Sequence, residues 1–365
     1  MATHGALAFA LQNPQGMRLL SSPLHPLCGL AVAATIGSSA CTAAPEDVSI
    51  TEARLRNLHE VVLPYYEQSG QAGSFIGVDG VKIAHHTFRH AGARSAIVFA
   101  PGRSEGSHSF MELFYDLRDQ PYDIFVIDHR GQGASGRMLP DPLKGHVVKF
   151  QDYITDYDQF VRDVVHPERY DHVFGVAHSM GGAITLRYAA QHPETFDALV
   201  LSAPMLQIDM GPLTEETALS YASSVPADET VPLGGDGTTA PQFSGNYLTT
   251  NPAGFAVLNE VDNIYPTRRV GRATYNWLAE SIRTNQDQRM HPELIKQPIV
   301  LFQALNDNVV VPAAQTTFCA AATNCKLMPL ANTRHELFYA DDNVRANVLA
   351  EAFAFMGIVA SNPAR

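Results

Sequence analysis

The stretch Val176-Ala177-His178-Ser179-Met180-Gly181-Gly182 decides the fold. It follows the apolar run His172–Ala177, which predicts a strand, and it precedes Ala183–His192, which predicts a helix. Small residues around Ser179 let strand and helix approach each other across a sharp turn. A serine at such a turn, beside the free N–H groups of a helix N-terminus, has the setting of a nucleophile elbow. We therefore predict that Ser179 is a catalytic nucleophile.

Short apolar runs alternate with helical segments along most of the chain. The predicted strands are Ala96–Ala100, Asp123–Ile127, His172–Ala177, Ala198–Leu201, Ile299–Phe302 and Lys326–Leu330. Continuous apolar runs separated by helices are typical of a parallel sheet that is buried on both faces. The predicted fold class is therefore α/β, with a mostly parallel central sheet and helices on both faces. A hairpin is also predicted over Ser74–Phe88, and a last helix over Asn343–Met356.

The alternation stops between residues 206 and 291, where the turn-rich segment Leu233–Pro241 does not resemble a strand. Because so long a stretch between two core strands is most simply an insertion, we predict an inserted cap or lid over residues 206–291. The core is then formed by residues 74–205 and 292–360. Residues 41–73 are predicted as an N-terminal lead-in, helical over Ala43–Gln71 with a break at Pro64.

Two polar residues follow later predicted strands and can complete the catalytic apparatus. Asp307 follows the strand Ile299–Phe302, and His335 follows Lys326–Leu330. The carboxyl ends of parallel strands are where active sites of open α/β sheets collect. A serine hydroxyl needs an adjacent base, so we predict His335 as general base and Asp307 as the acid that orients it. Glu336, Asp341 and Asp342 are rival acids, although they lie in or after the histidine loop rather than at another strand end.

Backbone N–H groups are expected to bind the negative charge that develops on the substrate oxygen. One is expected from Met180, which follows the nucleophile. The other is expected from Arg103, in the loop Pro101–Gly106 that follows the strand Ala96–Ala100. These two residues form the predicted oxyanion hole.

Composition narrows the classes of protein to consider. With 45% hydrophobic and 17% charged residues, the chain has the make-up of a globular protein rather than of a disordered one. The formal net charge is −12. Because an acidic surface repels phosphate backbones, nucleic-acid binding is not expected. No apolar run reaches the ~18 residues that a membrane-spanning helix needs.

Residues 1–40 have the pattern of a secretory signal, with a basic start at Arg18, an apolar run over Leu27–Ile36, and small residues before Cys41. The pattern predicts export to the bacterial envelope, as a periplasmic protein or as a membrane-anchored lipoprotein carrying lipid on Cys41. Ser38 weakens the lipoprotein pattern, because an aliphatic residue is usual there. The alternative is a disordered extension with a misassigned start. Met17 is a candidate for the true start of the signal, because residues 1–16 add nothing that a signal needs.

Of the four cysteines, Cys28 lies inside the predicted signal and Cys41 directly follows it. The other two, Cys319 and Cys325, have five residues between them, at the end of a predicted helix and the start of the last predicted strand. A turn this short can bring their Cα atoms within the ~4.4–6.8 Å that a disulfide requires. Such a bond would persist in an oxidising compartment. We therefore predict a Cys319–Cys325 disulfide, with two reduced cysteines as the alternative.

Several motifs together resemble the bacterial lysophospholipases and monoacylglycerol lipases of the α/β-hydrolase superfamily, from about Gly77 to Met356. The motifs are Ala100–Glu105, Ile127–Gly136, Gly145–Val147, Ala177–Gly182, His335–Glu336 and, for the lysophospholipase branch in particular, Pro101 and Gly271–Trp277. The resemblance implies the α/β-hydrolase fold, a triad of Ser179, Asp307 and His335, and oxyanion N–H groups from Arg103 and Met180. It also implies structural roles for Asp128, His129 and His146, and no metal or organic cofactor.

The substrate expected from this resemblance is a carboxylic ester of a single-chain lipid. A serine aminopeptidase of the same fold is the alternative, because residues 206–265 contain eight Asp or Glu and no Lys, Arg or His, and acidic groups could hold a free amino terminus. Neutral or zwitterionic lipids would also tolerate this acidic segment. A non-catalytic binding protein of the same fold would lack one of the triad residues, and all three are present.

Overall fold

A single sheet of eight strands crosses the molecule, in the order β1-β2-β4-β3-β5-β6-β7-β8. Its strands are β1 (Gly70–Ile76), β2 (Lys82–Phe88), β3 (Ser95–Ala100), β4 (Tyr122–Ile127), β5 (His172–His178), β6 (Ala198–Ser202), β7 (Ile299–Ala304) and β8 (Cys325–Leu330). Strands β3 to β8 pair in parallel, and β2 pairs antiparallel to both β1 and β4. The computed structural model describes residues 45–232, 234–238 and 241–361. The six strands and the hairpin predicted from the sequence are confirmed.

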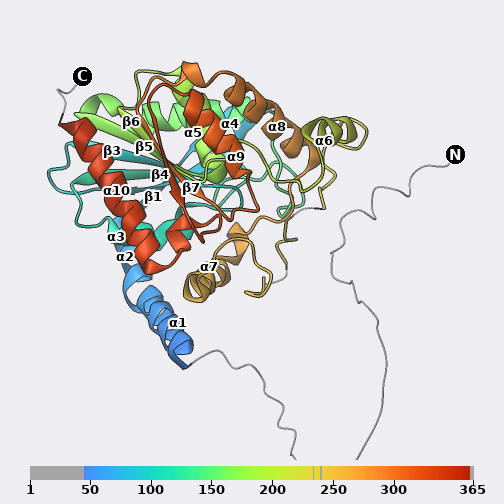
Figure 1. Cartoon of the computed structure of the whole chain (residues 1–365). Helices are drawn as coiled ribbons and strands as arrows, with labels where there is room; N and C mark the ends of the chain where they lie inside the picture. Colours follow the sequence, from blue (N-terminus) through green and yellow to red (C-terminus); the bar gives the residue numbers. More distant parts are fainter. Residues whose placement is uncertain (1–44, 233, 239–240, 362–365) are drawn as a thin grey trace, which may run out of the picture. The chain divides into compact units, whose positions relative to one another are not determined.

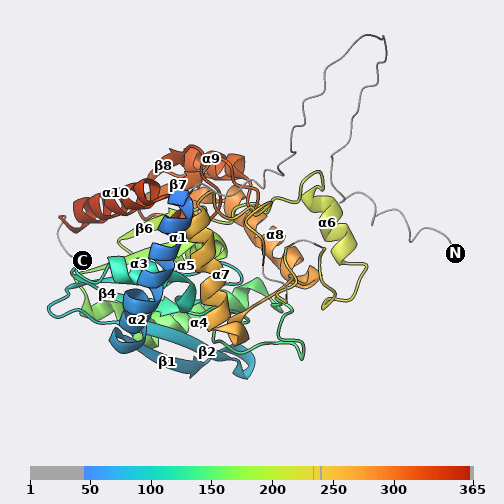
Figure 2. The ribbon, with the colours of Figure 1, turned by 90° about the horizontal axis from the view of Figure 1, so that it is seen from below.

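Helices cover both faces of this sheet (Figures 1 and 2). The helices are α1 (Pro45–Asn57), α2 (Leu63–Ser69), α3 (Met111–Asp116), α4 (Phe150–Phe160), α5 (Ser179–Gln191), α6 (Glu215–Ala222), α7 (Pro252–Ile264), α8 (Tyr275–Met290), α9 (Pro312–Ala321) and α10 (Asp342–Ala360). Side chains of α4, α5, α8 and α9 form one apolar core with the sheet, and side chains of α3, α7 and α10 form a second one. The mostly parallel α/β class is confirmed, because β5, β6 and β7 are buried at every position.

The lead-in differs from its prediction at Pro64. The chain does not break there: a π-helical turn, Leu58–Val62, joins α1 to α2, and Pro64 lies in the first turn of α2. A proline is tolerated in a first turn because its missing N–H would be unpaired there anyway. A wide turn before the proline also relieves the clash between its ring and the preceding carbonyls.

The long segment between β6 and β7 contains α6, α7 and α8, and these helices pack at different places. Helix α8 packs against α4 and α5, and α6 packs on α8, whereas α7 lies beside α1, as Figure 2 shows. His59 of the π-helical turn bonds Glu260 of α7 at 2.9 Å. The lead-in therefore packs on a helix that is distant in sequence.

The last helix, α10, is longer than predicted, and it bears on the expectation that no apolar run is long enough to span a membrane. By length and composition, α10 could cross a membrane: an 18-residue window of it has a mean hydropathy of 1.2, although Arg345 and Glu351 interrupt its apolar residues. Val348, Ala352 and Met356 of α10 nevertheless belong to the core on one face of the sheet. Only 17% of this window is buried, so α10 contacts the core along one narrow face. The predicted signal, Cys28 and Cys41 lie outside the described residues.

Candidate active site

Ser179 is the first residue of α5 and directly follows β5. The helix thus begins four residues earlier than the sequence predicted, at the nucleophile candidate itself. Ser179 has a φ of 51°, a left-handed conformation that non-glycine residues rarely adopt and that a nucleophile elbow imposes. A Cβ on Gly181 would lie 2.0 Å from the carbonyl oxygen of Ala100, so only glycine lets α5 approach β3 this closely.

Ser179, His335 and Asp307 form a hydrogen-bonded chain across the ends of three strands. His335 Nε2 lies 2.8 Å from Ser179 Oγ, and His335 Nδ1 lies 2.7 Å from Asp307 Oδ2. With Nδ1 protonated toward the carboxylate, Nε2 is free to accept the serine proton. The three residues are buried, with exposed fractions of 6%, 3% and 5% in the order of the chain of bonds. The geometry is that of a nucleophile, a base and an orienting acid.

Asp307 is fixed by its own loop. Its Oδ1 accepts hydrogen bonds from the backbone N–H groups of Val309 (2.8 Å) and Val310 (3.1 Å), which leaves Oδ2 for the histidine. The rival acids do not take this position: Asp341 and Asp342 lie at the start of α10, and Glu336 is close to His335 but bonds another residue. Glu336 contacts His178, at 3.3 Å, and Asp342 lies 3.6 Å from Arg54.

The two expected oxyanion donors flank Ser179. The N–H of Met180 lies in the first turn of α5, where no intrahelical acceptor precedes it. In the loop after β3, the N–H of Gly102 bonds Glu105 and the N–H of Ser104 bonds Gln132, whereas the N–H of Arg103 has no acceptor in the described part of the chain. This loop touches the nucleophile, because a Cβ on Gly102 would lie 3.0 Å from Ser179 Cβ. An unpaired N–H next to the serine is available to a developing oxyanion.

The side chain of Arg103 continues from the same loop toward the start of α8. Its guanidinium donates to Ser104 Oγ at 3.1 Å and to the backbone carbonyl of Gly271, and it lies over the Trp277 ring, 5.2 Å from the centroid. Among the described residues it makes no ion pair, and its Nε is buried without an acceptor. Burial lowers the pKa of Arg103 to about 10, and the group stays charged at neutral pH. Within the described part of the chain, the residue that provides the candidate oxyanion N–H thus also carries a cation without a counter-charge.

The other His and Asp residues singled out in the sequence are not part of this chain of bonds. Asp128 accepts from the N–H groups of Ser107 (2.6 Å) and Ala134 (2.7 Å), and thereby shapes the loop after β4. His129 is buried, and burial lowers its pKa to about 3. His146 Nδ1 lies 2.9 Å from Thr274 Oγ1. These contacts are structural.

Sequence reasoning missed two members of the site, His178 and Glu105. Both lie in sequence motifs whose other residues were assigned the catalytic roles. In the structure, both are buried next to Glu336. The atoms of His178, His335 and Glu336 that could bind a metal lie within 4.8 Å of one another. Both ring nitrogens of His335 already bond Ser179 and Asp307, so a metal ion here would have to displace that chain of bonds. The arrangement therefore suits hydrogen bonding rather than metal binding.

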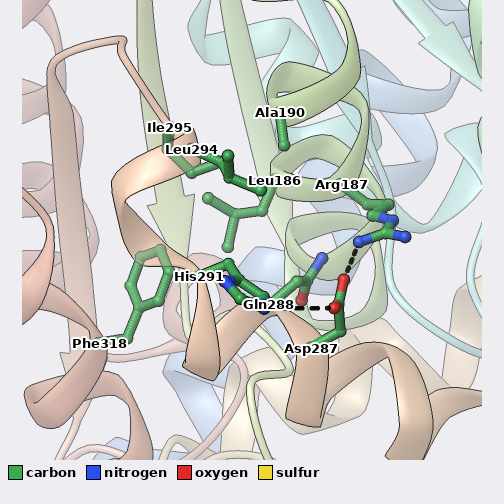
Figure 3. A pocket seen from close by; sticks show the side chains of 9 residues that line it. All are labelled: Leu186, Arg187, Ala190, Asp287, Gln288, His291, Leu294, Ile295 and Phe318. Carbon is green, nitrogen blue, oxygen red and sulfur yellow. Dashed lines mark hydrogen bonds and ion pairs between the residues drawn. The ribbon is translucent and has the colours of Figure 1, made fainter.

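A pocket lies along α5, away from the nucleophile (Figure 3). It is lined by residues of α5, α8, α9 and the turn after α8, namely Leu186, Arg187, Ala190, Asp287, Gln288, His291, Leu294, Ile295 and Phe318. Leu186 is seven residues beyond Ser179 in α5, roughly 10 Å along a helix axis. The triad residues are absent from its lining.

Cys319 at the end of α9 and Cys325 at the start of β8 form a disulfide, with 5.2 Å between their Cα atoms. The bond joins a helix to the strand that leads into the His335 loop. It therefore closes a short turn close in sequence to the catalytic base.

Comparison with known proteins shows that this chain is similar to hydrolases. The family described as "Serine aminopeptidase, S33" matches residues 91–342. Lysophospholipase L2 of Escherichia coli (strain K12) is 32% identical over 295 residues, which are 78% of this chain and 86% of that protein. Probable lysophospholipase L2 of Haemophilus influenzae is 28% identical over 303 residues, which are 81% of this chain and 95% of that protein.

Solved structures share the fold at low sequence identity. A soluble variant of monoglyceride lipase from Saccharomyces cerevisiae has a TM-score of 0.63 at 17% identity and covers 80% of this chain and 96% of its own. A carboxyl esterase from Bacillus coagulans has a TM-score of 0.64 at 16% identity, with 80% and 99% covered. These similarities support the α/β-hydrolase architecture.

Proposed function

The chain belongs to the serine aminopeptidase S33 family of hydrolases, and on that premise we propose that it cleaves carboxylic esters of single-chain lipids, with lysophospholipids as the preferred class. The observation that carries the proposal is the hydrogen-bonded chain Ser179–His335–Asp307. The similarity to two proteins named lysophospholipase L2 supports an ester rather than a peptide substrate.

The geometry supports an acyl-enzyme mechanism. Ser179 Oγ attacks the ester carbonyl while its proton passes to His335 Nε2, and Asp307 stabilises the imidazolium that forms. The N–H groups of Met180 and Arg103 hold the carbonyl oxygen as it becomes negative. The tetrahedral intermediate collapses as His335 returns the proton to the departing glycerol oxygen, which leaves the acyl group on Ser179. Water, deprotonated by His335, then releases the fatty acid and restores the serine.

Arg103 supports a head group that contains phosphate. Its backbone N–H lies beside the nucleophile, and its guanidinium, at the other end of the side chain, has no carboxylate partner among the described residues. Arginine forms strong charge-assisted bonds with phosphate oxygens. In a lysophospholipid the ester carbonyl and the phosphate are separated by the short glycerol backbone, a span comparable to an arginine side chain. A monoacylglycerol has no group of this charge.

The aminopeptidase alternative has less support from the described carboxylates. Three acids of the segment 206–265 already have basic partners: Glu215 bonds Arg289 at 2.6 Å, Glu260 bonds His59 at 2.9 Å, and Asp228 lies 3.7 Å from Lys144. The acids close to the catalytic histidine are buried and have partners of their own: Glu105 accepts from the N–H of Gly102, and Glu336 bonds His178. A substrate ammonium would have to compete for these groups.

A substrate panel tests the proposal. Purified protein is assayed with a lysophosphatidylcholine and a monoacylglycerol of the same acyl chain, a short p-nitrophenyl ester and an aminoacyl p-nitroanilide. We expect the lysophospholipid to have the highest kcat/KM, and Ser179→Ala to lower every ester rate by on the order of 10⁶. Arg103→Gln should lower kcat/KM for the lysophospholipid at least 10-fold more than for the monoacylglycerol. Arg137→Gln is the matched control, because Arg137 bonds backbone carbonyls. Preference for the anilide would contradict the proposal and favour the peptidase.

Export to an oxidising compartment is proposed as the location, with lipidation of Cys41 as a further proposal. The Cys319–Cys325 disulfide supports export, because such bonds are rare where thiols are kept reduced. Labelling of cells with a lipid precursor tests the second proposal: lipid should be incorporated into the wild-type protein and not into Cys41→Ser. Labelling of both proteins would contradict it.

A further inference from the structure

Three buried ionisable side chains, His178, Glu336 and Glu105, lie close to the triad and have no role in the acyl-enzyme mechanism. They come from three different segments: His178 ends β5 just before the nucleophile, Glu336 follows the catalytic histidine, and Glu105 belongs to the oxyanion loop. Their exposed fractions are 0%, 5% and 8%. Buried charged groups are costly unless they are paired and hydrogen-bonded, so their contacts define their protonation states.

His178 is held between two acceptors. Its Nδ1 lies 3.1 Å from the backbone carbonyl oxygen of Ser202 and 3.3 Å from the Ser202 hydroxyl, and its Nε2 lies 3.3 Å from Glu336 Oε1. Because the carbonyl and the carboxylate can only accept, these contacts favour a proton on each ring nitrogen, which makes the ring an imidazolium. Burial opposes this charge, but the negative charge of Glu336 and its hydrogen bond to the ring outweigh burial and raise the pKa of His178 to about 9. The ring centroid lies 4.7 Å from that of His335.

Glu105 and Glu336 lie within reach of a hydrogen bond to each other, and Glu336 Oε2 is buried without another partner among the described residues. Two carboxyl groups can share such a bond only when one of them is protonated. Burial, together with the charge of Glu336, raises the pKa of Glu105 well above its usual range. Burial acts in the same direction on Glu336, but the His178 imidazolium outweighs it and lowers the pKa of Glu336. The proton therefore resides on Glu105, and the negative charge on Glu336 balances His178.

Glu105 also contacts the oxyanion loop directly. Its Oε2 accepts a hydrogen bond from the N–H of Gly102 at 2.5 Å. Gly102 is packed on the nucleophile, and the next residue, Arg103, supplies the candidate oxyanion N–H. A continuous chain of bonds thus runs from the nucleophile elbow through Glu336 and Glu105 to the oxyanion loop.

We propose that Glu105 is a positioning residue that acts as the neutral member of a one-proton carboxyl pair with Glu336, and that this pair holds the oxyanion loop in register with Ser179. Oxyanion donors must be placed accurately, because a small displacement from the developing charge loses much of their effect. The other ionisable groups that face the pair are His335 and the Tyr339 hydroxyl, which donates to the carbonyl oxygen of Ser109. Asp307 of the triad acts on His178. The inference rests on the serine-ester chemistry of the proposed function but not on the choice of head group.

Two isosteric substitutions with opposite expected outcomes test the proposal. Glu105→Gln keeps a neutral group that accepts from Gly102 and donates to Glu336, so it should retain kcat within about 3-fold of wild type on a short p-nitrophenyl ester. Glu336→Gln removes the charge that balances His178, and it should lower kcat at least about 30-fold with little change in KM. Glu105→Leu, which can make neither bond, should lower kcat at least about 10-fold.

The pH profile supplies a readout that a merely structural role would not change. Wild type should lose activity at alkaline pH as the pair and His178 lose protons, and Glu105→Gln should move this alkaline limb to higher pH because one of the titrating groups is gone. Equal losses in Glu105→Gln and Glu336→Gln would overturn the proposal, and so would an unchanged alkaline limb. If Glu336→Gln does not fold, the comparison of Glu105→Gln with Glu105→Leu decides, and equal kcat values in that pair would overturn it. Absence of ester cleavage by wild type would instead contradict the proposed function.

Discussion

The substitution Asp307→Asn tests how the orienting acid works, because the structure fixes the direction in which the new amide would face. Two backbone N–H groups, of Val309 and Val310, donate to Oδ1 of Asp307. In Asp307→Asn these donors select the amide oxygen, since the reverse orientation would leave buried donors facing each other at a cost of about 1–3 kcal/mol each. The amide NH₂ must then face His335 Nδ1, where the carboxylate oxygen lies at 2.7 Å in the wild type.

An amide donor at this position forces the wrong histidine tautomer. Nδ1 becomes the acceptor, the ring proton moves to Nε2, and Nε2 can no longer take the proton of Ser179. In serine-protease triads this exchange lowers kcat by about 10⁴, which corresponds to about 5 kcal/mol of transition-state stabilisation. We expect a loss of the same order here, with an unchanged melting temperature because the two backbone contacts survive.

The assay is steady-state hydrolysis of a short p-nitrophenyl ester, with Asp209→Asn as the control. Asp209 Oδ1 accepts from the N–H of Gly211, and Asp209 takes no part in the triad. The control should keep wild-type kcat. If Asp307→Asn retained kcat within 10-fold of wild type, Asp307 would not be the residue that orients the base.

Three further predictions concern stability and substrate access. The pKa of His178 is raised from 6.5 to about 9, so the stabilisation by its charge is complete below pH 6.5 and is lost as the pH rises through about 9. The free energy of unfolding should therefore fall between these pH values. A free energy of unfolding that rises over this range would refute the imidazolium. Replacing Cys319 and Cys325 by serine should cost about 2 kcal/mol and lower the melting temperature by about 3 °C, whereas an unchanged value would indicate that the bond adds no stability. Deleting residues 234–245 should change lysophospholipid hydrolysis more than short-ester hydrolysis, and equal effects would contradict a gating role for this segment.

The fold could be predicted from the sequence where the local pattern and the tertiary environment agree. The parallel strands read as apolar runs because both faces are buried, and the elbow at Ser179 was recognisable because its small residues are required by the close approach of α5 to β3. The lead-in was predicted less well. Pro64 indicated a break, but the π-helical turn that accommodates it depends on packing that the sequence does not display.

The candidate site, like the fold, could be predicted only in part from the sequence. Ser179, Asp307 and His335 could be inferred because each follows a strand that is visible as an apolar run, and the structure brings them together. Glu105 and His178 could not, because both contact Glu336, which is far away in the chain and meets them only after folding. A lone glutamate in a loop reads as a solvated charge until its burial is known.

The central claim is that Ser179 carries the acyl group of a single-chain lipid ester during turnover. The direct measurement is mass spectrometry of the protein after acid quench during hydrolysis of a lysophosphatidylcholine, with Ser179→Ala treated in parallel. We expect the peptide that contains Ser179 to gain the mass of the fatty acyl group, and the same peptide of the variant to remain unmodified. Fatty acid release without an acyl adduct on Ser179, or with an adduct on another residue, would contradict the claim.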